Sequence, residues 1–100
     1  MEVHITESEG TMTARLVGRL DTPAAVEVSR EVQPLLDHAG DTLILDCSEL
    51  TYISSSGLRI FLTLRKAAAT KGGKVIVRGI NADVRSVFMI TGFLNLFEIQ

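Results

Sequence analysis

The sequence has one cysteine, no tryptophan and two prolines, and aromatic residues make up only 5% of its 100 residues. A single cysteine, Cys47, excludes an internal disulfide and fits a reducing compartment. The two separated histidines, His4 and His38, and the single cysteine do not have the spacing of metal ligands. We therefore expect no disulfide scaffold, no metal site and no cofactor, and we interpret Cys47 as an inert core thiol.

Charge of one sign and long apolar runs are also lacking. The net charge is −2, and no basic cluster exceeds two adjacent residues, which argues against nucleic acid as a direct partner. No apolar run approaches the roughly 20 residues that span a bilayer. Residues 1–10 are polar and acidic, unlike a signal peptide. These features predict a cytoplasmic protein that does not insert into a membrane.

What is present indicates a globular chain, with 46% hydrophobic and 22% charged residues. A chain of 100 residues is long enough for one core without covalent staples. We predict a single domain over residues 1–100.

The first half of the chain begins with two short alternating patterns. Val3 and Ile5 predict a strand, and the alternation over Met12–Arg19 predicts a second strand paired with it as an antiparallel hairpin. The start of a helix is predicted by Asp21-Thr22-Pro23, with Thr22 or Asp21 as the N-cap. Pro34 should kink or end that helix near Gln33 because proline removes a backbone hydrogen bond.

The second half alternates strands and helices. Leu43-Ile44-Leu45 is an unbroken apolar run, which predicts a strand covered on both faces. The later predicted elements are a helix over about 55–70 ended by Gly72-Gly73, a strand over 74–78, a helix from Asn81 to Gly92, and a last strand over 94–100. The order β-β-α-β-α-β-α-β predicts an α/β fold with a mixed, mostly parallel sheet.

Ser54, Ser55, Ser56 and Gly57 lie where the central strand gives way to the long helix. A serine hydroxyl at a helix N-cap satisfies a backbone N–H, and substitution of such a cap costs about 1 kcal/mol. The same end of a helix favours an attached anion such as a phosphate. Helix capping and a phosphate-related role both remain open from these residues alone.

A serine hydrolase is the obvious enzyme to consider at this junction. A nucleophile elbow needs glycine two residues before the serine and two after it. Gly57 fills the later place relative to Ser55, but Ile53 occupies the earlier one. Both histidines precede the serines without a carboxylate pattern that suggests a triad. We therefore predict that the protein is not an enzyme.

The stretch Tyr52-Ile53-Ser54-Ser55-Ser56-Gly57-Leu58 resembles the STAS domains of bacterial anti-sigma factor antagonists. Gly18-Arg19-Leu20-Asp21 is similar to the family's Gly-x-Leu-Asp before its first helix. Leu45–Ser48 is similar to the end of its central strand, and Ile80–Gly92 to its third helix. The resemblance covers essentially the whole chain.

The resemblance implies a regulator of transcription that acts by partner switching. The unphosphorylated protein would bind an anti-sigma factor that is also a serine kinase, and phosphorylation of Ser55 would end that binding until a serine phosphatase removes the phosphate. Ser54 stands where the family often has aspartate. The implied partner-binding residues of an expected monomer are Asp21, Thr22, Ser54, Ser55, Ser56, Gly57, Leu58 and Arg59.

Other roles share this fold. A STAS subunit can dock on the ATPase of a lipid-transport ABC complex without any phosphorylation, and a STAS segment can form the cytosolic tail of an anion transporter. A small serine hydrolase is the alternative from a different class. A kinase-like ATPase or a transporter ATPase encoded beside the gene would separate the first two roles.

Overall fold

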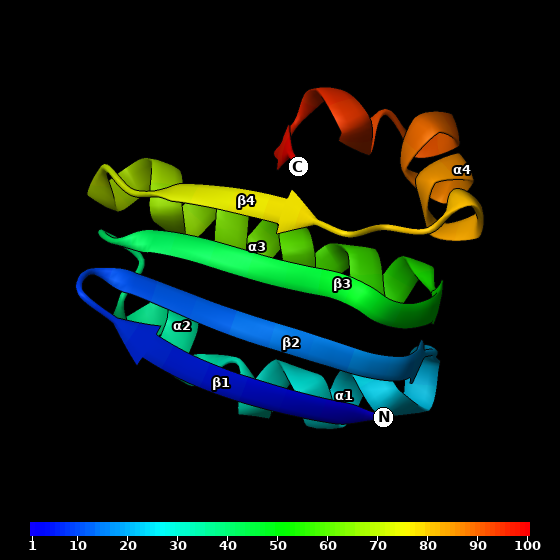
Figure 1. Cartoon of the computed structure of the whole chain (residues 1–100), viewed down its shortest axis with the longest axis horizontal. Helices are drawn as coiled ribbons and strands as arrows, with labels where there is room; N and C mark the ends of the chain where they lie inside the picture. The colour runs from blue at the N-terminus through cyan, green and yellow to red at the C-terminus, as the bar shows by residue number, and fades with distance from the viewer.

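The computed structural model describes residues 1–100 and contains one five-stranded sheet in the order β1-β2-β3-β4-β5 (Figure 1). The strands are β1 (Glu2–Ser8), β2 (Thr11–Leu20), β3 (Thr42–Ile53), β4 (Lys74–Arg78) and β5 (Glu98–Ile99). The helices are α1 (Thr22–Glu31), α2 (Gln33–Asp37), α3 (Ser55–Lys71), α4 (Ala82–Thr91) and the short 3-10 helix η1 (Phe93–Asn95). None of the helices combines the length and apolar character that a bilayer crossing requires.

The pairing of the strands confirms the predicted mixed sheet. β1 and β2 form an antiparallel hairpin, whereas β2, β3, β4 and β5 are parallel neighbours. The order of elements therefore agrees with the predicted α/β fold, apart from the break within the first helix and the added η1.

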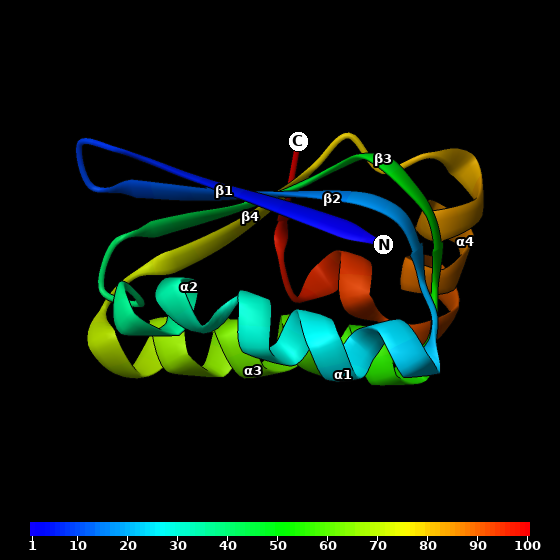
Figure 2. The same ribbon diagram turned by 90° about the horizontal axis from the view of Figure 1, so that it is seen from below.

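The helices α1, α2 and α3 all lie against one face of the sheet, as the side view in Figure 2 shows. Leu43 and Leu45 are buried on that face, while Ile44, on the other face, is only half-buried. The prediction of a strand covered on both faces is therefore wrong. The physical reason is the strand order: each parallel crossover moves the same way along the sheet, and right-handed crossovers in one direction place every helix on one face.

The first predicted helix is divided in two at Val32, two residues before Pro34. α1 ends at Glu31, and α2 begins at Gln33, which confirms the predicted interruption, because proline cannot donate the backbone hydrogen bond that would continue the helix. At the start of α1, the side chain of Asp21 accepts a hydrogen bond of 3.0 Å from Ala24 N. Asp21, rather than Thr22, is therefore the N-cap.

The predicted strand over 94–100 is wrong in its first part. Phe93–Asn95 form η1, and only Glu98–Ile99 pair with β4. In an extended strand, Phe93, Asn95 and Phe97 would all face the core because alternate side chains share a face. The turn of η1 buries both phenylalanines and leaves Asn95 exposed, and the Phe93 ring lies edge-on to Phe88 with centroids 5.7 Å apart.

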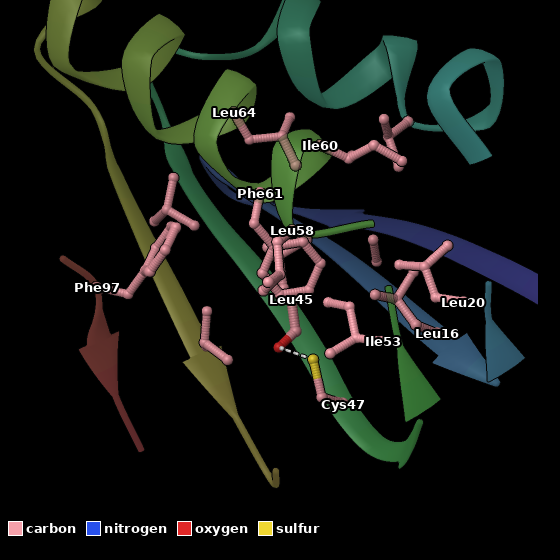
Figure 3. Close-up of a cluster of buried hydrophobic side chains, with 14 of the residues drawn as sticks. Leu16, Leu20, Leu45, Cys47, Ile53, Leu58, Ile60, Phe61, Leu64 and Phe97 are labelled. Atoms are coloured by element: carbon pink, nitrogen blue, oxygen red, sulfur yellow. Dashed lines mark hydrogen bonds between the residues drawn. The ribbon is translucent and has the colours of Figure 1, made fainter. Parts of the chain in front are cut away.

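The core lies between the sheet and its helices, and Cys47 belongs to it (Figure 3). The Cys47 thiol contacts the carbonyl oxygen of Leu45 at 3.7 Å. Burial, with a smaller contribution from the charge of Asp46, raises the pKa of Cys47 to about 12. The burial of Cys47 confirms its predicted place in the core, and the raised pKa keeps the thiol protonated at neutral pH.

Candidate functional site

Ser54 joins β3 to α3 and serves the fold. Its Oγ accepts a hydrogen bond of 3.1 Å from Gly57 N, so Ser54 is the N-cap of α3. Its own backbone N–H donates to the carbonyl oxygen of Leu20 at 2.9 Å, which ties this turn to the end of β2. Ser54 is only 8% exposed, so it presents little surface to another protein.

Gly57 sets how closely α3 can approach the sheet. A Cβ atom at this position would lie 2.7 Å from Leu20 Cγ and 3.0 Å from Ile53 Cγ1, closer than side chains tolerate. Leu20 and Ile53 are both buried at the ends of their strands. Only glycine therefore lets the first turn of α3 rest on the ends of β2 and β3.

Ser55 is the first residue of α3, and its side chain is exposed. Ser56, the next residue, is half-buried. The hydroxyl of Ser55 is thus the most accessible of the three at this turn. A negative charge added there would lie at the positive end of a helix of 17 residues, where the helix dipole favours it.

The structure brings the start of α1 next to this turn. The hydrogen bond from Ser54 N to Leu20 O places Asp21 and Thr22 beside the serines. The carboxylate of Asp21 is engaged as the cap of α1, whereas Thr22 is exposed. Two helix N-termini, those of α1 and α3, therefore open onto the same end of the sheet.

A shallow groove of about 250 Å³ runs between α1 and α3 from this end. Its lining carries the hydroxyls of four residues, an apolar floor and one charged group, the guanidinium of Arg59. The lining residues are Thr22, Ala25, Val26, Ser29, Ser56, Arg59, Ile60 and Thr63. Sequence reasoning found Thr22, Ser56 and Arg59 but missed the others, although their helical spacing within each helix is visible in the sequence.

On the other side of the serine turn, Arg19 and Tyr52 form a pair that the sequence analysis missed. They are register partners on β2 and β3, and the Arg19 guanidinium carbon lies 4.4 Å from the centre of the Tyr52 ring. The ring remains 40% exposed. The cation–π contact favours this orientation of the Tyr52 ring, which lines a small pocket with Asp83 and Val84 of α4. Its only sequence signal is the strand register, which requires the pairing of β2 with β3.

Leu58 lies elsewhere than the predicted surface. It is 6% exposed and belongs to the hydrophobic core beneath the turn (Figure 3). Leu58, like Gly57 and Ser54, therefore positions the turn, whereas Ser55 and Arg59 are exposed and Ser56 is half-buried.

The two histidines do not lie at the serine turn. His4 is on β1 and contacts Glu2 at 3.1 Å. His38 follows α2 and contacts Asp41 at 3.3 Å, at the end of the sheet where β3 begins. Neither ring is positioned to accept a proton from Ser55, which a hydrolytic triad would require.

Comparisons with known proteins agree with this architecture. "Putative anti-sigma factor antagonist BtrV" of Bordetella bronchiseptica is 30% identical over 99% of this chain and 85% of its own length. The anti-sigma-B factor antagonist of Bacillus subtilis is 22% identical over 100% of this chain and 91% of its own length.

Solved structures of the anti-sigma factor antagonist SpoIIAA show the same fold. The unphosphorylated form matches with a TM-score of 0.75 and 19% identity, covering 99% of this chain and 87% of that one. The phosphorylated form, from Bacillus, also gives 0.75, with 20% identity over 99% and 91% of the two chains. The model of the STAS domain family matches residues 2–100. The chain therefore belongs to the STAS domain family.

Proposed function

We propose that this protein is an anti-sigma factor antagonist switched by phosphorylation of Ser55. In its unphosphorylated form it binds an anti-sigma factor with serine-kinase activity and so releases a sigma factor. The observation that carries the proposal is the exposed hydroxyl of Ser55 at a rigid turn, beside the cap residue Ser54. The same role is supported by relatives that are named anti-sigma factor antagonists and that align with nearly the full length of this chain.

The chemistry asked of Ser55 is that of a substrate. A kinase would transfer the terminal phosphoryl group of ATP to Ser55 Oγ, and the hydroxyl proton would leave to a base of the kinase. Ser55 belongs to a turn held by the hydrogen bonds of Ser54 to Gly57 N and to Leu20 O. Such a turn presents the acceptor oxygen with little conformational freedom, which reduces the entropic cost of docking.

The phosphate would act at the interface between the two proteins. It adds a charge of about −1.5 to −2 at neutral pH, together with bulk. Within this chain the charge lies at the N-terminus of α3, where it is favoured. Against a partner surface that had accepted a neutral hydroxyl, the same charge is repelled by any carboxylate and blocks close contact. Phosphorylation would thus end binding, and a serine phosphatase would restore it.

A capture experiment with matched variants tests this function. Wild type, Ser55→Ala, Ser55→Glu and Ser8→Glu are used as baits in lysate of the host, and phosphopeptides of the recovered baits are mapped. Ser8 is exposed at the hairpin of β1 and β2, so Ser8→Glu adds the same charge away from α3. We expect wild type, Ser55→Ala and Ser8→Glu to capture a kinase-like ATPase, Ser55→Glu to lose it, and phosphate to map to Ser55.

A different result would reject the proposal. If all four baits capture the same transporter ATPase and Ser55 carries no phosphate, the serines are helix caps and the protein is a subunit that docks on that ATPase. If Ser8→Glu loses the partner as fully as Ser55→Glu, the loss reflects overall charge and not the turn at Ser55.

A further inference from the structure

Arg59 is a cation placed one helical turn after Ser55. The two residues are at positions i and i+4 of α3, where side chains on a helix are neighbours with about 5–6 Å between their Cβ atoms. Helical side chains also tilt toward the N-terminus, so the long side chain of Arg59 extends toward the turn that holds Ser55 and Ser56. Arg59 and Ser56 line the same groove.

The guanidinium of Arg59 is free of other partners. It is exposed and takes part in none of the ion pairs within the chain. Two charged residues at the end of β2 are already engaged, since Arg19 is stacked on Tyr52 and Asp21 caps α1. Arg59 is also the one charged residue among those that line the groove between α1 and α3.

We propose that Arg59 pairs with the phosphate on Ser55 of the same chain, so that phosphorylation also withdraws the only cation from the groove. This inference rests on the proposed function for its biological meaning. Arginine suits the role because its planar guanidinium can donate two parallel hydrogen bonds to phosphate oxygens. The order along the helix, anion first and cation four residues later, is the favourable one.

The pairing gives phosphorylation two effects on partner binding at the same surface. In the unphosphorylated protein, Arg59 stands free among the hydroxyls of Thr22, Ser29 and Thr63, a site that suits an acidic side chain of the partner. In the phosphorylated protein the same guanidinium is neutralised from within. A partner carboxylate then loses its counter-ion and meets the new negative charge as well.

A phosphorus NMR titration tests the pairing without any partner. Phosphoserine is installed at position 55 during synthesis in the wild-type background and in Arg59→Gln, Arg59→Lys and Lys66→Gln. Lys66 is an exposed cation on the same helix, two turns further on, and serves as the matched control. The second ionisation of a phosphoserine lies near pH 6 (pKa ≈ 6), and a nearby cation lowers its midpoint.

We expect Arg59→Gln to raise the titration midpoint by about 0.2 to 0.4 pH units, the change that an i,i+4 ion pair produces. Arg59→Lys should raise it less, Lys66→Gln should leave it unchanged, and 1 M salt should remove the difference. An unchanged midpoint in Arg59→Gln, or an equal rise in Lys66→Gln, overturns the inference.

The outcome of the titration does not depend on the outcome of the capture experiment. Because the phosphoserine is installed during synthesis, the titration tests Arg59 whether or not a kinase modifies Ser55. A shifted midpoint together with failed capture rejects the proposed function alone, and an unshifted midpoint together with successful capture rejects the pairing alone.

Discussion

The neighbouring residues Ser54 and Ser55 have different structural roles in this protein. Ser54 is buried and caps α3, whereas Ser55 is exposed and free to be modified. We expect Ser54→Ala to lower the free energy of unfolding by about 1 kcal/mol, since it removes an N-cap. Ser55→Ala should change it by less than about 0.5 kcal/mol, as surface substitutions do. Urea denaturation of both variants measures the difference.

Ser54→Asp is the informative control for this prediction, because aspartate caps a helix as well as serine does. It should unfold near the wild-type urea concentration. If Ser55→Ala is the more destabilised variant, or if Ser54→Asp is as unstable as Ser54→Ala, then Ser54 does not act as the cap.

Gly57→Ala sets two effects of opposite sign against each other. Alanine favours a helix over glycine by about 1 kcal/mol, yet its Cβ would lie 2.7 Å from Leu20 Cγ. Leu20 is fully buried and cannot move aside without disturbing its neighbours. Overpacking of a core costs about 1–3 kcal/mol, so we expect net destabilisation. Ser56→Ala, on the same turn but half-buried, should show no such loss.

Single residues also show what the sequence could predict at this site. Asp21 and the serine cap are local signals, because a cap and the N–H groups that it serves lie within one turn of chain. The packing role of Gly57 depends on Leu20, which is 37 positions earlier in the sequence and contacts it only in the folded chain. No pattern around Gly57 itself carries that information.

Between elements, the pKa of Asp46 is lowered where β3 pairs with the end of β4. Partial burial alone would raise the pKa of Asp46, but hydrogen bonds from Ser48 and the charge of Arg78 outweigh it. Ser48 Oγ donates to Asp46 Oδ1 at 2.8 Å, and Arg78 Nη2 lies 3.6 Å from Asp46 Oδ2. Asp46 thus links Arg78, at the end of β4, to Ser48 on β3.

This arrangement predicts a pH dependence of stability with a definite sign. A carboxylate whose pKa is lower in the folded state stabilises the fold above its unfolded pKa, near 4, and loses this effect as the pH falls through the folded pKa. The stability advantage of wild type over Asp46→Asn should therefore be present at pH 6 and shrink below about pH 4.

Thermal unfolding from pH 6 to pH 2.5 measures this advantage. Glu31→Gln, which removes an exposed carboxylate that forms no ion pair, is measured beside it as the control. An advantage of wild type over Asp46→Asn that stays constant across this range would contradict the lowered pKa.

Predictions of single strands from the sequence were wrong where tertiary packing decided the local structure. Strand-like alternation over 94–100 was overridden by the need to bury Phe93 and Phe97 without Asn95. The apolar run Leu43-Ile44-Leu45 predicted two covered faces, yet the strand order places every crossover helix on one face. Breaks such as Pro34 were predictable because their cause lies within the helix itself.

For the whole molecule, Arg59 should contribute to recognition only when Ser55 is unmodified. We expect Arg59→Gln to weaken binding to the ATPase captured by wild type by roughly tenfold, which is about 1.4 kcal/mol, while Lys66→Gln binds as wild type. With phosphoserine at position 55, the two variants should bind equally weakly. Isothermal titration at two salt concentrations measures this, and equal weakening by both substitutions would show a general effect of charge.

Phosphorylation should leave the fold of the molecule intact. Ser55 is exposed on the first turn of α3, and the buried residues beneath it, Gly57 and Leu58, face away from the added group. The added charge gains about 0.3–1 kcal/mol from the helix dipole, so nothing drives the core to rearrange.

Nitrogen–proton correlation spectra of the unmodified and phosphoserine-55 proteins show directly whether phosphorylation changes the fold. We expect shifted amide signals at the turn, along the groove between α1 and α3, and near Arg59. Amides of β1 and of the aromatic cluster around Phe88 and Phe97 should stay in place, and the dependence of unfolding on urea should keep its slope. Shifts spread through the aromatic cluster would mean that the switch is a change of packing, which a partner would read from the altered shape of the whole domain and not from the charge at one turn.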